Sequence, residues 1–235
     1  MKRVRISVII PAINEQKYIR HSLENLERQT FKDFEVIVVD GGSTDGTQAI
    51  ARRYARVIVE KKRGISLARN IGAKAANGEI LLFMDADTKP SRKLLQTYDR
   101  VFRDRRVVAA TGPILPLEKT SRRVGAGYRF VSIVFVKASI KAGRPSIVGS
   151  NFAVRKSAFD RAHGFDERLM TYEDWDLSTR LKRLGRIAYS NDAVVHTSIR
   201  RINAWGISGY FVYHTLNIFR YHLFRRPQTD YKQIR

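Results

Sequence analysis

Short apolar runs rich in Val and Ile alternate with segments of helical periodicity through the first half of the chain. The runs with strand character are residues 4–10, 34–39, 56–60, 80–84 and 107–111. The helical segments between them are residues 15–28, 44–54, 66–76 and 91–103, with Asn14 and Ser43 as candidate caps of the first two. Strands that are apolar throughout are buried on both faces. The alternation therefore predicts an α/β fold, a Rossmann-like and mostly parallel sheet with helices on both faces.

The second half of the chain is organised differently, because this alternation stops after Gly112. A strand is predicted at residues 149–155, a helix at 173–184, and short strands at 186–190 and 194–196 that return to the same sheet. We therefore divide one large domain into residues 1–112 and 113–198. A C-terminal helical, aromatic extension covers residues 199–235.

Net charge narrows the choice of partner. The 235 residues include 44 Lys and Arg against 22 Asp and Glu, a formal net charge of +22. Such an excess favours a polyanion, such as nucleic acid, a nucleotide or an anionic lipid. Residues 120–150 contain six basic residues and no acidic one. The chain has no Cys, which excludes disulfides, thiolate metal sites and a cysteine nucleophile, so any metal must use oxygen or imidazole ligands.

The C-terminal extension combines many aromatic residues with Arg225 and Arg226, but polar residues such as Asn203 and His214 interrupt it. This composition favours a segment that lies at a membrane interface over a helix that spans the membrane. A C-terminal helix packed on the core explains the same pattern equally well.

Polar residues follow the predicted strands, at the edge where an open parallel sheet binds its ligands. Pro11, Asn14 and Glu15 follow the first strand. The turn at residues 40–47 follows the second, and its glycines allow a close backbone approach to a nucleotide. The alternative is an ordinary turn that caps the next helix.

Asp85 and Asp87 place two carboxylates where the fourth strand ends. Mg²⁺ binds such oxygen ligands together with substrate phosphates. The alternative is that Asp87 caps the helix that begins near Pro90, while Asp85 is solvated.

Three acids begin the helix predicted at residue 173. Asp174 among them is a candidate general base if it faces the crevice, or a member of a capping box with Thr171. His196 ends an apolar run, and either completes a metal site or is a structural histidine.

Taken together and in order, these motifs resemble the family 2 glycosyltransferases of the GT-A fold. The resemblance rests on SVIIPAINE at residues 7–15, VDGGSTDGT at 39–47, ARNIG at 68–72, DAD at 85–87 and EDWD at 173–176. It covers roughly residues 6–196. Gly41 departs from the family pattern, because the family has a second acid beside Asp40. The Q-x-x-R-W motif of processive polysaccharide synthases does not occur in the sequence.

The resemblance implies an inverting transfer of a sugar from a nucleoside diphosphate to an acceptor hydroxyl or phosphate. The half at residues 1–112 is then expected to bind the nucleotide sugar through Pro11, Ala12, Asn14, Glu15, Asp40, Gly42, Arg69, Asp85, Ala86 and Asp87. Asp87 and His196 are expected to hold Mg²⁺ or Mn²⁺. The half at residues 113–198 is expected to bind the acceptor and to supply the catalytic base, Asp174, with Glu173 beside it. Ser150, Asn151 and Trp175 are expected near the donor sugar and the acceptor.

The clustering of charge and aromatic residues extends this expectation to a lipid-linked acceptor and an anionic membrane surface. The expected location is cytoplasmic, peripheral on the inner face of the cell membrane. A nucleotidyltransferase is the first alternative, because it shares the donor and metal chemistry but releases pyrophosphate. A nucleic-acid-binding protein also fits the charge, but acids at the strand ends repel phosphates, so no nucleic-acid partner is expected.

Overall fold

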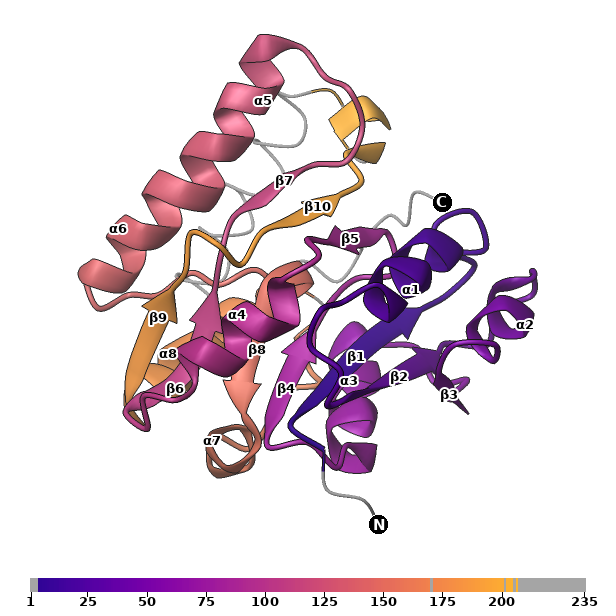
Figure 1. The fold of residues 1–235 in the computed structure, drawn as a ribbon, viewed down its shortest axis with the longest axis horizontal. Helices are drawn as coiled ribbons and strands as arrows, with labels where there is room; N and C mark the ends of the chain where they lie inside the picture. The colour runs from indigo at the N-terminus through magenta and orange to yellow at the C-terminus, as the bar shows by residue number, and fades with distance from the viewer. Residues whose placement is uncertain (1–3, 170, 201, 205, 207–235) are drawn as a thin grey trace.

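The computed structural model describes residues 4–169, 171–200, 202–204 and 206. Its centre is a seven-stranded sheet in the order β3-β2-β1-β4-β8-β6-β9 (Figure 1). The strands are β1 (Ile6–Ala12), β2 (Phe34–Asp40), β3 (Arg56–Val59), β4 (Ile80–Phe83), β6 (Val107–Thr111), β8 (Phe152–Arg155) and β9 (Arg186–Tyr189). Among these described strands, β8 alone runs antiparallel to its neighbours, β4 and β6. The predicted mostly parallel sheet is confirmed.

Helices cover both faces of this sheet, because alternate side chains of a strand point to opposite faces. Val8 and Ile10 of β1 belong to one buried cluster, and Ile9 between them belongs to the other. The first cluster is covered by α1 (Ile19–Glu27), α2 (Thr47–Ala51) and α4 (Leu94–Val101). The second is covered by α3 (Ile65–Ala75), α7 (Lys156–Arg161) and α8 (Glu173–Lys182). The sheet is thus buried on both sides, as the apolar strands predict.

A small second sheet has the order β5-β10-β7 and consists of β5 (Thr88–Pro90), β10 (Val195–Thr197) and β7 (Ile114–Pro116). The prediction that residues 194–196 return to the main sheet is therefore wrong, although β9 does join it. A strand of three residues presents too few side chains for its pattern to specify a partner. Pro90, expected near the start of a helix, ends β5 instead.

A long helix follows β7 and was not predicted as such. It consists of α5 (Arg122–Arg129), the π-helical turn η1 (Phe130–Phe135) and α6 (Val136–Lys141). Two glycines and several β-branched residues lower its intrinsic helix propensity, which hid it in the sequence. Figure 1 shows this helix beside β7, β10 and β9, at the end of the main sheet toward which the arrows of β6 and β9 point.

Within the described part of the chain, no helix has the length and apolar character that crossing a bilayer requires. Residues 201, 205 and 207–235, most of the predicted C-terminal extension, lie outside the described residues. Both interpretations of that extension stay predictions.

Candidate active site

The loops that follow β1 and β2 interlock at the carboxyl edge of the sheet. The side-chain oxygen of Asn14 accepts the N–H of Thr44 at 2.8 Å, and Ser43 Oγ accepts the N–H of Asn14 at 2.8 Å. Thr47 Oγ1 accepts the N–H of Glu15 at 2.8 Å. Asn14 and Ser43 therefore do not cap α1 and α2, because their side chains are used to bind one loop to the other.

Asp40 lies beneath the second of these loops with no exposed surface. Its Oδ1 accepts the N–H groups of Gly42 at 3.0 Å and Ser43 at 2.8 Å and the amide of Gln48 at 2.8 Å, and its Oδ2 accepts the Ser43 hydroxyl. Gly42 has φ +83, a left-handed conformation that glycine tolerates best. The carboxylate is enclosed and holds the turn from below, and the contact of Asp40 with the nucleotide stays a prediction.

The end of β1 supports the same turn. Ala12 is buried and pairs with Asp40 in the parallel register, while Pro11 before it is partly exposed. The Ala12 carbonyl accepts the N–H of Gly41 at 2.8 Å. A Cβ on Gly41 would lie 3.3 Å from the side chain of Ile13, so an acid at this position would require a small shift of Ile13.

The Asp85-Ala86-Asp87 segment follows β4 and joins two charge clusters. Asp85 is 37% exposed and accepts a hydrogen bond from Arg69 at 3.2 Å, whereas Asp87 lies 3.2 Å from Arg200. Ala86 between them is buried. The two carboxylates of the motif are thus directed to different cations.

The first cluster, which we call the base cluster, consists of Arg69, Asp85, Glu173 and Asp174. Arg69 is 2% exposed, donates to Glu173 Oε1 at 2.8 Å, and lies over the ring of Phe165 at 5.3 Å. Three carboxylates around one buried guanidinium leave an excess of negative charge. Burial raises the pKa of Glu173 to about 7, the charge of Asp174 adds to the rise, and Arg69 opposes it.

Two backbone N–H groups fix the Asp174 carboxylate at the start of α8. Its Oδ2 accepts the N–H of Gly149 at 2.9 Å, and its Oδ1 accepts the N–H of Trp175 at 2.8 Å. Burial raises the pKa of Asp174, while Arg69 and these two N–H groups oppose the rise. A carboxylate with a raised pKa, fixed by backbone donors, has the character of a general base.

Gly149 is the link between Asp174 and Arg69. A Cβ at this position would collide with the Arg69 guanidinium, so glycine alone leaves room for the buried cation. Gly149 was not predicted as a site residue, because a glycine has no side chain whose chemistry would indicate a function.

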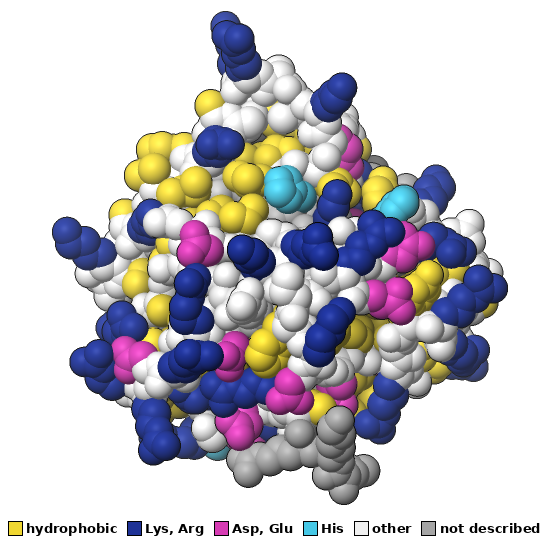
Figure 2. Space-filling model, viewed as in Figure 1, with side chains coloured by type: hydrophobic (Ala, Val, Ile, Leu, Met, Phe, Trp, Pro, Cys, Tyr) yellow, Lys and Arg dark blue, Asp and Glu magenta, His cyan; other side chains and the backbone are white. Residues whose placement is uncertain are grey.

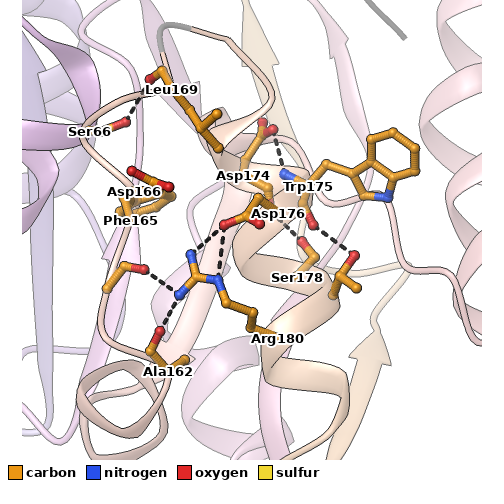
Figure 3. Close-up of polar contacts among 12 residues, drawn as sticks. Ser66, Ala162, Phe165, Asp166, Leu169, Asp174, Trp175, Asp176, Ser178 and Arg180 are labelled. Carbon is orange, nitrogen blue, oxygen red and sulfur yellow. Dashed lines mark hydrogen bonds and ion pairs between the residues drawn. The ribbon is translucent and has the colours of Figure 1, made fainter. Parts of the chain in front are cut away.

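The start of α8 is anchored from behind. Arg180 donates from Nε at 2.9 Å and Nη2 at 2.6 Å to Asp176 Oδ2, and its Nη1 donates to the carbonyls of Ala162 and Gly164 (Figure 3). Tyr172, the residue before α8, has φ +67, and such strained backbone is typical of functional sites.

Helix α3 holds the loop that leads to α8. Asn70 donates to the Phe165 carbonyl at 2.9 Å and accepts the Phe165 N–H at 2.9 Å, and Ser66 donates to the Leu169 carbonyl at 3.2 Å. Arg69 and Asn70 thus both contact Phe165 in this loop, Arg69 through the ring and Asn70 through the backbone. This role of Asn70 was not predicted.

The second cluster, which we call the Arg200 cluster, was also missed. Arg200 donates to both carboxylate oxygens of Glu15, from Nη1 at 2.8 Å and from Nη2 at 2.5 Å, and its guanidinium lies over the ring of Tyr18 at 4.9 Å. Although burial opposes it, the hydrogen bond with Glu15 and the charge of Asp87 raise the pKa of Arg200. A single Arg among 44 basic residues gave no distinguishing signal in the sequence.

His196 does not join Asp87 in a metal-binding group. No group of three His, Cys, Asp or Glu is arranged to hold a metal within the described residues. Thr197 Oγ1 donates to Asp87 Oδ1 at 3.3 Å, and neighbouring residues of a strand point to opposite faces, so His196 is directed away from Asp87. Burial, together with the charge of Lys89, lowers the pKa of His196.

The three residues predicted near the sugar and the acceptor differ in how far their side chains are exposed. Ser150 is 4% exposed. Asn151 has no exposed surface, accepts the Tyr98 hydroxyl and donates to the Ala193 carbonyl at 2.8 Å, and its place near the donor sugar stays a prediction. Trp175 is partly exposed and projects away from Asp176 and Arg180 in Figure 3, with its ring 5.8 Å from that of Tyr172.

The fold and the ordered motifs now define a class, an α/β protein of the GT-A type. The family description Glycosyl transferase family 2 matches residues 7–162, more than half of the chain. The chain therefore belongs to glycosyl transferase family 2.

One solved structure and two sequence relatives illustrate this membership. The mannosyltransferase PcManGT from Pyrobaculum calidifontis, in complex with GDP-Man and Mn²⁺, is 25% identical with a TM-score of 0.66, over 92% of this chain and 65% of that chain. Glycosyltransferase AglE of Haloferax volcanii is 38% identical over 100 residues, 39% of this chain and 33% of that protein. A Methanococcus voltae dolichyl N-acetyl-alpha-D-glucosaminyl phosphate 3-beta-D-2,3-diacetamido-2,3-dideoxy-beta-D-glucuronosyltransferase is 26% identical over 226 residues, 83% of this chain and 67% of that protein. The matches to the first relatives span between 27% and 33% of those proteins' lengths.

Proposed function

We propose that this chain transfers a sugar from a nucleoside-diphosphate sugar to a hydroxyl or phosphate acceptor, with inversion at the anomeric carbon. The observation that carries the proposal is the position of Asp174, at the head of α8 and bound to the N–H groups of Gly149 and Trp175. Family membership supports the same reaction.

In this reaction Asp174 removes the proton of an acceptor hydroxyl. The acceptor oxygen then forms a bond to the anomeric carbon as the bond from that carbon to the diphosphate breaks, and the nucleoside diphosphate departs with the electron pair. Glu173 is hydrogen-bonded to Arg69, so we assign it to holding the guanidinium and not to proton transfer. Trp175 and Ser150 are proposed to border the acceptor side.

The donor is proposed to bind along the loops after β1, β2 and β4. The groups assigned to it are Pro11, Ala12, Asn14, Glu15, Gly42, Arg69, Asp85, Ala86 and Asp87. Asp40 is assigned to holding the turn beneath the donor, because its oxygens already accept hydrogen bonds from that turn.

A divalent cation, Mg²⁺ or Mn²⁺, is proposed to bind beside Asp87, where carboxylates from separate loops gather. Asp87 and Glu15 already surround the positive charge of Arg200, and carboxylate oxygens are ligands that both metals accept. When bound, such a cation supplies positive charge that stabilises the departing diphosphate. The complex of PcManGT with GDP-Man and Mn²⁺ supports this choice.

The acceptor is proposed to be lipid-linked, with the enzyme peripheral on the inner face of the membrane. The name of the Methanococcus voltae relative, a dolichyl-phosphate-sugar transferase, supports a lipid-linked acceptor. The basic residues between 120 and 150 support attraction to anionic lipid.

The test is a screen of UDP-, GDP- and dTDP-sugars with Mn²⁺ or Mg²⁺, read first as thermal stabilisation and then as turnover. The expected product is a nucleoside diphosphate. Release of pyrophosphate instead would assign the chain to the nucleotidyltransferases, and stabilisation by no nucleotide sugar with either metal would contradict the proposed donor.

A further inference from the structure

The long helix formed by α5, η1 and α6 has an apolar face that points away from the rest of the described residues. On its inner side, Ser132 and Val136 are buried, and the Tyr189 hydroxyl donates to the Ser132 carbonyl at 2.8 Å. On its outer side, Phe130 is 61% exposed, and Val134 and Phe135 are each 51% exposed. Four of the eight large exposed hydrophobic residues among the described ones lie in η1, one turn and a half of this helix.

Basic residues flank this apolar face. Arg122, Arg123 and Arg129 precede it, Lys137 and Lys141 follow its centre, and all five are exposed. No Asp or Glu occurs between Glu118 and Asp160. Figure 2 shows hydrophobic side chains gathered over the region that this helix occupies in Figure 1, with Lys and Arg side chains around them.

Phe with aliphatic residues, bordered by Lys and Arg, is the composition of helices that lie in the interface of a bilayer. The rings and the aliphatic side chains enter the region between headgroups and acyl chains, while the cations remain with anionic headgroups. Nucleic acid would match the cations but offers nothing to Val131 and Val134, which cannot stack on bases as aromatic rings do.

We propose that the long helix is a membrane-docking surface, which binds anionic phospholipid through the outer face of η1 and the basic residues of α5 and α6. This deepens the proposed function, on which it rests for the lipid-linked acceptor. β7 leads directly into α5 and pairs with β10, whose Thr197 donates to Asp87. Docking through this helix therefore keeps the small sheet, and the site beside it, near the membrane.

The first test is flotation of the full chain with vesicles of phosphatidylcholine alone or mixed equally with phosphatidylglycerol. We expect binding to the mixed vesicles only, weakened by salt. The triple variant R122Q/R123Q/R129Q should bind the mixed vesicles about a hundredfold more weakly, because each cation near an anionic surface contributes about 1 kcal/mol to the binding free energy. The matched control R20Q/R53Q/K74Q removes three exposed cations, from α1, the turn after α2 and α3, and should bind nearly as well as wild type.

The second test reports which face contacts lipid and does not depend on affinity. The chain has no Cys, so Val134→Cys carries a single polarity-sensitive fluorophore, and Val59→Cys on β3, 43% exposed, is the matched control. The dye at position 134 should shift to the blue on addition of mixed vesicles, and the dye at position 59 should not.

The proposal is overturned if the wild type does not float, if Phe130→Ser with Phe135→Ser floats as wild type does, or if both dyes respond alike. It is also overturned if a random-sequence RNA shifts the emission of the dye at position 134 further to the blue than vesicles do. A change from dimer to monomer in the Phe variants, with unchanged flotation, would likewise overturn it. Sugar transfer to a soluble acceptor should be the same in the docking variants and in wild type, which separates failure of docking from failure of the proposed reaction.

Discussion

The Arg200 guanidinium lies 3.2 Å from the Asp87 carboxylate, so the residue proposed to hold a divalent cation already pairs with a cation of the chain itself. Glu15 completes the arrangement at 2.5 Å, and all three side chains are at most 14% exposed. Arg200 thus neutralises two carboxylates that would otherwise repel each other in a poorly hydrated place.

Removing the positive charge of Arg200 is expected to increase the affinity of the site for a metal ion. Arg200→Gln should bind Mn²⁺ about tenfold more tightly, because Asp87 and Glu15 lose a competing positive charge. The metal-free variant should be less stable by roughly 3–5 kcal/mol, since two carboxylates lose their partner. Free Mn²⁺ measured by electron paramagnetic resonance, and unfolding by denaturant, check the two effects.

Arg168→Gln is the matched control, because Arg168 is 90% exposed and pairs with Asp166 on the surface. It should change neither quantity. Asp87→Ala should lose metal-dependent donor binding. Unchanged or weaker Mn²⁺ binding in Arg200→Gln would show that Arg200 does not compete for the site.

The closeness of Gly149 to Arg69 gives a second prediction. Gly149→Ala should reduce sugar transfer at least a hundredfold, because the new methyl group displaces Arg69 from Glu173 and shifts the N–H that Asp174 accepts. It should also cost about 1–3 kcal/mol of stability through overpacking. The new methyl group of Gly127→Ala meets no atom of the described residues within 4 Å, so this variant should keep the activity and raise stability slightly, as expected in a helix. Equal activity of the two variants would contradict the role of Gly149.

The hydrophobic periodicity of the sequence was sufficient to predict where several strands and helices begin. β2 and β6 begin where predicted, and α8 begins at Glu173, because long apolar runs and an acidic first turn are local signals. The ordered motifs also led to Asp85 and Glu173, which the structure brings together on Arg69.

The sequence did not reveal the features of the site that depend on tertiary contacts. His196 and Thr197 are adjacent in sequence, and only the pairing of β10 with β5 decides which of them faces Asp87. The sequence places Asn151 near the donor sugar but does not reveal that the Tyr98 hydroxyl and the Ala193 carbonyl bind its side-chain amide in the core. The partners of Arg200 lie 113 and 185 residues away, beyond any local pattern.

The raised pKa of Glu173 predicts a pH-dependent stability. Its carboxyl group binds a proton more tightly in the folded protein, with a pKa of about 7 against 4.5 when unfolded, so its contribution is fully present below pH 4.5 and is lost as the pH rises to about 7. The loss should amount to about 3 kcal/mol. Glu173→Gln should lack this component, so its unfolding free energy should fall less than that of wild type between these two pH values. Glu27→Gln, which alters an exposed residue, should follow wild type, and parallel curves for all three proteins would contradict the assignment.

Asp174→Asn separates proton removal from donor binding. The amide keeps the size of the side chain but cannot take the acceptor proton, so kcat should fall by about 10²–10⁴-fold. The donor is proposed to bind on the β1, β2 and β4 loops, so donor affinity measured by calorimetry should stay within about twofold of wild type. Asp160→Asn on α7, an exposed carboxylate, is the control and should leave both quantities unchanged. Wild-type turnover by Asp174→Asn would remove Asp174 from the reaction, whereas loss of donor binding with turnover would mean that the carboxylate supports the donor site and not proton transfer.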